Sequence, residues 1–287
     1  MTLLNQNAYE DSMLSNDEVF LMATKEQWKN VIGRVAFLNC DPLFHGLDEQ
    51  WDVLPAPPSW LTGHLLRRDC VLAPIPAADY ARNAEDLVLV PEIGICSKGE
   101  VGSVLVFGDR PVSDMKSIAL PTDSMTSVAL LRYILAQENL VPTTELMGPD
   151  LETMLSQCDG ALLIGDRALE GAKEHPHLVQ MDLGEAWLQR TNKPMVFGVF
   201  AARKDTPVED VKAAQKALLH RLELFENDPS ERQAVIEWSM SRSELEYERL
   251  NRYFGEVFNR LDGEHKQGLE QFLVDACNLH QGSTFAW

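Results

Sequence analysis

The feature that most constrains this chain is a change of pattern near Val208. Before it, short apolar runs such as residues 31–38, 87–90 and 161–164 alternate with segments of helical periodicity. After it, only amphipathic segments rich in Leu, Glu and Lys follow, and we expect helices there. Alternating strands and helices predict an α/β fold with parallel-rich sheets.

The alternation restarts near Gly108, which predicts a chain divided into two lobes. We expect the chain to cross between the lobes twice, so that two strands form a hinge, and the C-terminal helices to pack on the first lobe. The predicted parts are residues 31–107 with 200–287, residues 108–199, and an N-terminal extension of unassigned role, residues 1–30. The cleft between two such lobes is the expected place for a small ligand.

The charge balance excludes two classes of partner. The chain has 25 Lys and Arg residues against 44 Asp and Glu residues, a net charge of −19. Nucleic acids and anionic membranes require a positive surface, so we expect neither as a partner. The sequence also has no run of roughly 18 apolar residues, and residues 1–30 lack the layout of a secretory signal. We therefore expect a cytoplasmic protein; the oligomeric state is not specified by the sequence.

The cysteines and histidines do not form a metal pattern. Five scattered cysteines, with no pair at CxxC spacing, predict neither a zinc site nor a disulfide framework. The sequence contains no GxSxG, P-loop, GxGxxG or HExxH motif. We expect a protein without a metal or a cofactor.

Four polar turns follow predicted strands and are candidates for the ligand site. They are residues 39–42, 97–103, 123–127 and 165–167. Hydroxyl groups and free backbone N–H groups at a helix start bind anions without any arginine, so an acidic protein can still bind a carboxylate. A Ser or Thr at a helix start is more often an ordinary cap, so the set of four is more informative than any single turn.

These turns, in this order, resemble the chorismate dehydratase family of the futalosine route to menaquinone. Residues 37–44 (FLNCDPLF) are similar to its "YLNxxPL" signature, and residues 97–104 (SKGEVGSV) match "SxGxVxSV". Further matches are "PSxL…DxxLxP" at residues 58–74 and "ALLIGDxAL" at 161–169. Residues 123–127 match "DxxSxTS" loosely, and residues 182–197 are similar to "DLGxxW…PFVF". Arg68 and Asn192 depart from the family, because glycine is common at both positions.

The resemblance implies a two-lobed fold like the type II periplasmic binding proteins and the loss of water from chorismate. It implies a catalytic role for Asn39. The residues expected to bind the substrate are Ser59, Ser97, Ser103, Ser124, Thr126, Ser127, Ile164, Gly165 and Asp166. For the general base, Asp41, His45, Asp166 and the enolpyruvyl carboxylate of the substrate remain open. The alternative function is a non-catalytic protein of the same fold that binds a small carboxylate.

Overall fold

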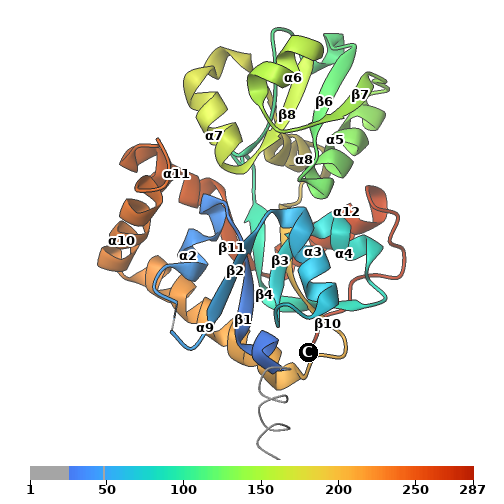
Figure 1. Ribbon diagram of the computed structural model, residues 1–287. Coiled ribbons are helices and arrows are strands. Elements are labelled where there is room, and N and C mark those ends of the chain that lie inside the picture. The colour runs from blue at the N-terminus through green and yellow to red at the C-terminus, as the bar shows by residue number, and fades with distance from the viewer. Residues whose placement is uncertain (1–25, 48) are drawn as a thin grey trace, which may run out of the picture.

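Three sheets carry the fold, and they lie in two lobes stacked one above the other (Figure 1). The computed structural model describes residues 26–47 and 49–287. The predicted extension therefore lies almost entirely outside the described residues. The strands of the first lobe are β1 (Val31–Val35), β2 (Asp52–Ala56), β3 (Ala73–Pro76), β4 (Leu87–Ser97), β10 (Met195–Arg203) and β11 (Phe258–Leu261). Those of the second lobe are β5 (Val104–Gly108), β6 (Ser117–Pro121), β7 (Thr143–Met147), β8 (Gly160–Ile164) and β9 (Val179–Asp182).

Helices cover the sheets of both lobes (Figure 1). The first lobe has α2 (Asp41–Phe44), α3 (Pro58–Arg67), α4 (Ala77–Arg82), α9 (Val208–Asn227), α10 (Pro229–Met240), α11 (Tyr247–Glu256) and α12 (Gly263–Asp275). The second has α5 (Met125–Gln137), α6 (Leu151–Gln157), α7 (Gly165–Glu174) and α8 (Leu183–Thr191). Short 3₁₀ turns are η1 (Gln27–Asn30), η2 (Leu38–Cys40), η3 (Val112–Asp114) and η4 (Pro176–Leu178). No helix of the described residues is both long enough and apolar enough to cross a membrane.

The sheets are mixed rather than parallel-rich. In the first lobe, β1 and β2 form a parallel pair, while the sheet ordered β11-β4-β10-β3 is antiparallel throughout. In the second lobe, the sheet is ordered β7-β6-β8-β5-β9, and β5 runs antiparallel to both neighbours. The prediction of parallel sheets missed that β4 runs toward the second lobe while β10 returns beside it, so these two strands have opposite directions.

Strand pairing also corrects the predicted lobe boundaries. Because β5 pairs with β8 and β9, the chain has already reached the second lobe at Val104. Because β10 pairs with β3 and β4, Met195 is already in the first lobe. The chain therefore crosses at residues 98–103 and 192–194, rather than at 107/108 and 199/200.

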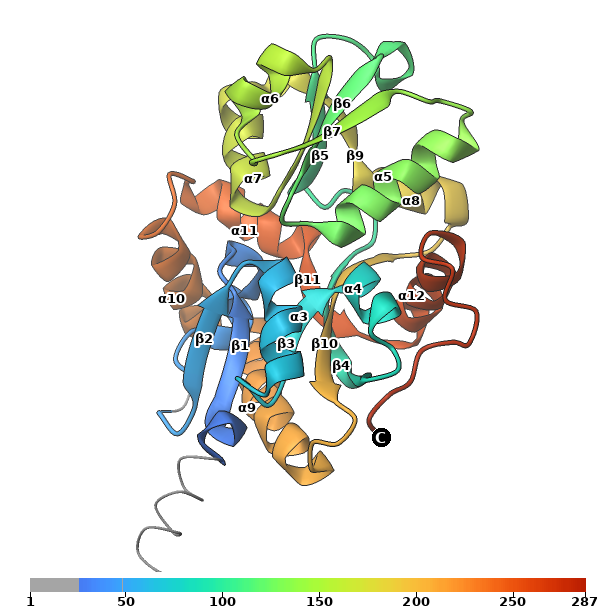
Figure 2. The same ribbon diagram turned by 45° about the vertical axis from the view of Figure 1, so that its right-hand side comes forward.

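The C-terminal helices pack on the first lobe, as predicted. Helix α9 contacts α2 and β4, α10 packs on α9 and α2, and α12 lies against β10 and α4. Figure 2 shows α11 passing directly beneath the second lobe, so this helix reaches the space between the lobes. The strand β11 was not predicted; it lies in the connection between two segments that were expected to be helices, residues 244–254 and 265–279.

Two departures from the family pattern have a structural reason. Arg68 and Asn192 are the C-cap residues of α3 and α8, and both adopt the left-handed conformation, with φ of 62° and 55°. Glycine adopts this conformation without a steric cost, which accounts for its frequency at both positions.

Candidate active site

A cavity lies between the lobes, with an empty volume of about 540 Å³ that opens in part to solvent. Both lobes contribute to its wall, as is usual for small-molecule sites. Its apolar wall includes Val35, Phe37, Ile75, Ile95, Val101, Phe197 and Val257. Its polar side chains are Asn39, Ser103, Ser124, Thr126 and Ser127. None of the described residues that line it carries a titratable side chain.

Seven of the ten residues predicted for the site line this cavity. They are Asn39, Ser103, Ser124, Thr126, Ser127, Ile164 and Gly165. Ser59, Ser97 and Asp166 do not line it. Ser59 follows the lining residue Pro58 in the first turn of α3. The Ser97 hydroxyl is fully buried and donates to the carbonyl of Gly99 at 3.2 Å, so it stabilises the first crossing.

Asn39 is held by its backbone, while its side-chain oxygen has no hydrogen-bond partner among the described residues. It lies in η2, and its carbonyl oxygen accepts a hydrogen bond of 3.2 Å from Asn259 Nδ2. Asn259 also donates to the carbonyl of Gly94 at 3.2 Å, which ties the turn to β4. The Oδ1 atom of Asn39 is buried and has no hydrogen-bond partner among the described residues. A buried orphan oxygen is costly, so this atom is suited to accept a hydrogen bond from a bound ligand.

The start of α5 supplies a group of hydroxyls. Ser124 caps the helix: its Oγ accepts from the backbone N–H of Ser127 at 3.3 Å and donates to Ser127 Oγ at 2.8 Å. Thr126 Oγ1 accepts from the backbone N–H of Ala78, across the cleft in α4, at 3.1 Å. The hydroxyl hydrogens of Thr126 and Ser127 therefore remain free to bind a ligand. Together with the positive end of the helix, they suit a carboxylate.

A single carboxylate fixes the first crossing next to the cavity. Asp182 caps α8 by accepting from the backbone N–H groups of Gly184 and Glu185 at 2.9 and 3.1 Å. The same carboxylate accepts from Val101 N at 3.0 Å and from Gly102 N at 2.8 Å. Four backbone donors on one partly buried carboxylate make this turn rigid, and Ser103 follows it directly.

The lobes touch each other through Asp166 and Gly165 at the start of α7. Asp166 Oδ1 accepts from the backbone N–H of Leu38, in the turn that carries Asn39, at 3.0 Å. Burial raises the pKa of Asp166 to about 6. Gly165 has a φ of 60°, and a Cβ there would lie 2.8 Å from the ring of Phe37. Asp166 therefore joins the two walls of the cavity.

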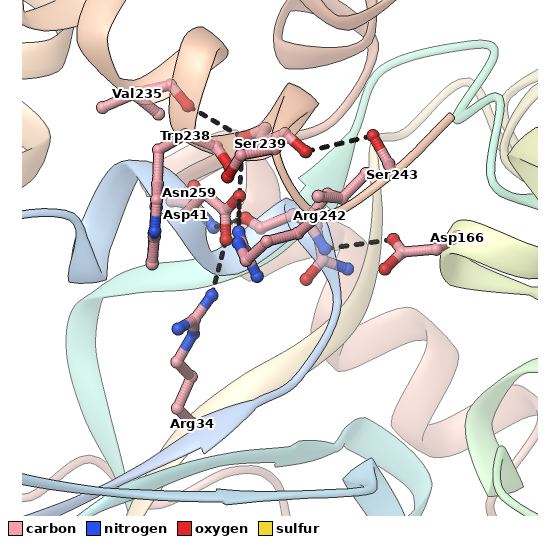
Figure 3. A network of polar contacts seen from close by, with 12 residues as sticks. Arg34, Asp41, Asp166, Val235, Trp238, Ser239, Arg242, Ser243 and Asn259 are labelled. Atoms are coloured by element: carbon pink, nitrogen blue, oxygen red, sulfur yellow. Dashed lines mark hydrogen bonds and ion pairs between the residues drawn. The ribbon is translucent and has the colours of Figure 1, made fainter. Parts of the chain in front are cut away.

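Asp41 belongs to a buried network beside this turn, which Figure 3 shows. Its Oδ1 accepts from Arg34 Nη2 at 2.6 Å, and its Oδ2 accepts from Ser239 Oγ at 2.6 Å and from Arg242. The guanidinium groups of Arg34 and Arg242 stack on Trp238, 4.8 and 4.0 Å from its ring centre. Both oxygens of Asp41 are occupied, and the residue does not line the cavity.

The other candidate bases also lie outside the lining. His45 Nδ1 is 3.0 Å from Glu231 Oε1, and the ring packs on Trp238 with 5.3 Å between centres. Asp166 is engaged by Leu38 as described above. Of the four bases left open, three are therefore side chains that do not reach the cavity.

The cysteines have the surroundings of packing residues. All five cysteines are free, and four of them are buried. Burial raises the pKa of the Cys40 thiol, next to Asn39, to about 12. Across the described ranges, no three or more His, Cys, Asp or Glu side chains gather as a metal site would require.

Three residues that shape the site were not predicted. Phe37 and Val257 line the cavity, and Tyr253 donates to Ser103 Oγ at 3.0 Å. Tyr253 and Val257 lie in the segment whose periodicity predicted only helices, where a buried tyrosine looks like an ordinary core residue. Phe37 belongs to the first family signature, which is the sequence signal that could have pointed to it; its contact with Gly165 is visible only in the structure.

Comparison with known proteins identifies the family. Residues 31–277 match the family described as menaquinone biosynthesis. The chain belongs to this family. One relative of the chain is a chorismate dehydratase from Thermus thermophilus. It is 34% identical over 213 residues, which cover 67% of this chain and 78% of the relative.

Solved structures confirm the fold of this menaquinone-biosynthesis family member. A protein from Archaeoglobus fulgidus aligns with a TM-score of 0.69 and 18% identity, covering 87% of this chain and 97% of the other. The alkanesulfonate-binding protein SsuA from Xanthomonas axonopodis pv. citri, bound to MOPS, aligns with a TM-score of 0.62 and 16% identity, covering 87% and 93%. At these identities the likeness establishes the fold alone, which is the predicted fold of the periplasmic binding proteins.

Proposed function

We propose that this protein removes water from chorismate to give 3-[(1-carboxyvinyl)oxy]benzoate. The observation that carries this proposal is the 34% identity to a chorismate dehydratase. The cavity between the lobes supports it, because its mixture of apolar wall and few polar groups suits a small organic acid.

The chemistry of the substrate agrees with a cavity of neutral donors. Chorismate is a dianion that loses the proton on the ring carbon bearing the enolpyruvyl ether, and then the hydroxyl of the neighbouring carbon. Loss of the proton moves charge through a ring double bond onto the ring carboxylate. Fixed donors on that carboxylate stabilise the transition state, because they interact more strongly as the charge develops.

We assign the ring carboxylate to the start of α5. Thr126 and Ser127 have free hydroxyl hydrogens there, and Ser124 orients Ser127. Asn39 and Ser103, on the opposite side, then meet the other carboxylate or the leaving hydroxyl. Ile164 and Gly165 contribute shape and backbone contact.

For the base, we propose the enolpyruvyl carboxylate of the substrate itself. No described residue of the lining has a side chain that takes up a proton near neutral pH. The protein then acts by holding the substrate in the reactive conformation and excluding water. The reaction forms only the aromatic product and water, with no net oxidation, so we propose a lyase that needs neither metal nor cofactor.

The test is to incubate the purified protein, dialysed against a chelator, with chorismate and to analyse the products by mass spectrometry. We expect a product lighter by one water that absorbs as a benzoate, and no such product with heat-denatured protein. If folded protein binds chorismate and returns it unchanged, the enzyme proposal fails and the chain is a binding protein. If it neither binds nor converts chorismate, the substrate assignment fails.

A further inference from the structure

We propose that Tyr253 is a positioning residue that makes Ser103 a hydrogen-bond donor toward the ligand in the cavity. As an effect on catalysis, this inference rests on the proposed function. The direction of the hydrogen bond between Tyr253 and Ser103 does not depend on that function. Tyr253 lies in α11, 150 residues after Ser103, and its oxygen reaches Ser103 Oγ, whose residue lines the cavity.

The phenol of Tyr253 has one described partner. Its side chain has no exposed surface, and its oxygen lies 3.0 Å from Ser103 Oγ. Burial raises the pKa of Tyr253 far above its usual range, so the phenol keeps its proton. A buried O–H group without an acceptor is costly, and Ser103 Oγ is the acceptor within reach. Tyr253 therefore donates, and Ser103 accepts.

This direction decides what Ser103 offers to the cavity. A serine hydroxyl has one hydrogen to donate, and the bond from Tyr253 leaves that hydrogen unused. The Ser103 carbonyl already accepts from Gly165 N at 2.7 Å, and Ser103 Oγ lines the cavity. A ligand oxygen carrying negative charge is the partner that such a hydroxyl binds best. Ser103 is thus prepared as a donor before the substrate arrives.

The surroundings hold Tyr253 in this orientation. Leu250, Tyr253 and Phe254 form the buried face of α11. One turn away, Arg249 pairs with Glu256 at 2.9 Å, and both side chains lie against Gly102 of the first crossing. The donor is therefore fixed relative to the crossing that carries Ser103.

A double-mutant cycle tests whether Tyr253 acts through Ser103. We expect Tyr253→Phe to lower kcat/KM for chorismate about tenfold and Ser103→Ala to lower it about a hundredfold, as for a lost transition-state donor. In the Ser103→Ala background, Tyr253→Phe is expected to have no further effect, because its acceptor is gone. Equal fold-losses in both backgrounds, or an unchanged rate in Tyr253→Phe, would overturn the proposal.

The matched control is Tyr80→Phe. Tyr80 is also fully buried, but its oxygen accepts from the backbone N–H of Thr284 at 2.8 Å and it does not line the cavity. This variant loses a buried phenol oxygen too, and we expect it to be less stable yet to keep the wild-type kcat/KM. If it lost as much activity as Tyr253→Phe, the loss would reflect stability, and the proposal would fail.

A second measurement does not depend on activity. In protein with labelled tyrosine, the Tyr253 hydroxyl proton is expected as a slowly exchanging NMR resonance that shifts or exchanges faster in Ser103→Ala. An identical resonance in both proteins would overturn the proposal. If the wild type does not convert chorismate while this resonance responds as expected, the proposed function fails and the orientation of Ser103 stands.

Discussion

At the scale of single residues, Asn39 differs from the other polar side chains of the cavity. Ser103, Ser124, Thr126 and Ser127 each have a hydrogen-bond partner in the protein, whereas Asn39 Oδ1 has none among the described residues. We expect Asn39→Ala to lower kcat about a hundredfold, because it removes a fixed polar contact to the reacting part of the substrate. Steady-state kinetics with chorismate measures this effect.

His45→Ala is the comparison for this prediction. His45 lies near the same turn but pairs with Glu231 outside the cavity lining. We expect it to keep a rate near that of the wild type. Equal and near-normal rates in the two variants would contradict the assignment of Asn39.

Arg68 provides a prediction about stability. Its left-handed φ of 62° is a conformation in which Ala is strained and Gly is not. We therefore expect Arg68→Gly to be more stable than Arg68→Ala by about 1 kcal/mol, the reverse of the usual order at helical positions. Both variants lose the ion pair with Asp205, so urea unfolding of the two isolates the backbone effect. Ala equal to or more stable than Gly would contradict the assigned conformation.

At the scale of elements, the start of α7 controls how closely the lobes approach. We expect Gly165→Ala to weaken substrate binding and to lower stability by about 1–3 kcal/mol. The added Cβ meets the Phe37 ring at 2.8 Å, and the φ of 60° strains any residue with a side chain. KM and the radius of gyration from small-angle scattering measure the two consequences of a more open cleft.

Gly148→Ala is the control, because a Cβ there has no atom within 4 Å. We expect it to leave KM and the radius of gyration unchanged. A Gly165→Ala protein that matched it in both would show that the Phe37 contact does not limit closure.

The elements differ in how far the sequence could predict them. The sequence predicts helices over residues 151–157 and 126–138. Helix α6 has the first of these bounds, and α5 begins one residue before the second, because each helix has an acidic or hydroxyl cap before an apolar face. Strand β11 could not be predicted, since its four residues follow an amphipathic helix and carry no turn signal of their own. Its partner β4 lies far away along the chain, and local periodicity does not report such pairing.

At the scale of the whole molecule, Asp166 couples lobe contact to pH. Burial raises its pKa from 3.8 to about 6, while the N–H of Leu38 and the charge of Arg242 act in the opposite direction. Asp41 and Glu170 add to the rise. The folded protein therefore binds this proton more tightly than the unfolded chain, so the contribution of Asp166 to stability falls as pH increases from about 4 to 6 and is level above that.

We expect Asp166→Asn to remove this dependence. Asparagine keeps an oxygen that accepts from Leu38 but does not titrate. Relative to the wild type, the variant should gain on the order of 2–3 kcal/mol of unfolding free energy between pH 4 and pH 6. Urea unfolding at several pH values measures this difference. A difference independent of pH would show that Asp166 titrates alike in the folded and unfolded states.

For the site as a whole, the sequence indicates which turns line the cavity but not which side chains of those turns point into it. Asn39, Ser103 and Thr126 follow strands, so the rule that ligands bind at strand ends brought them together correctly. Ser97 is the last residue of β4, yet its hydroxyl turns into the crossing and donates to the carbonyl of Gly99. The direction of a side chain within a turn depends on tertiary contacts, such as the hydrogen bonds that Asp182 accepts from the backbone of Val101 and Gly102. The spacing of residues in the sequence does not report such contacts.

The contact between Asn39 and Asn259 spans 220 residues, and this distance has a consequence for biosynthesis. A ribosome makes Asn39 well before Tyr253, Val257 and Asn259, the residues that complete its surroundings. A nascent chain therefore carries no finished pocket. A polypeptide ended by a premature stop codon before Tyr253 lacks the donor to Ser103, the Val257 wall and the Asn259 anchor together. Any truncation before Tyr253 therefore removes these three parts of the pocket as a unit.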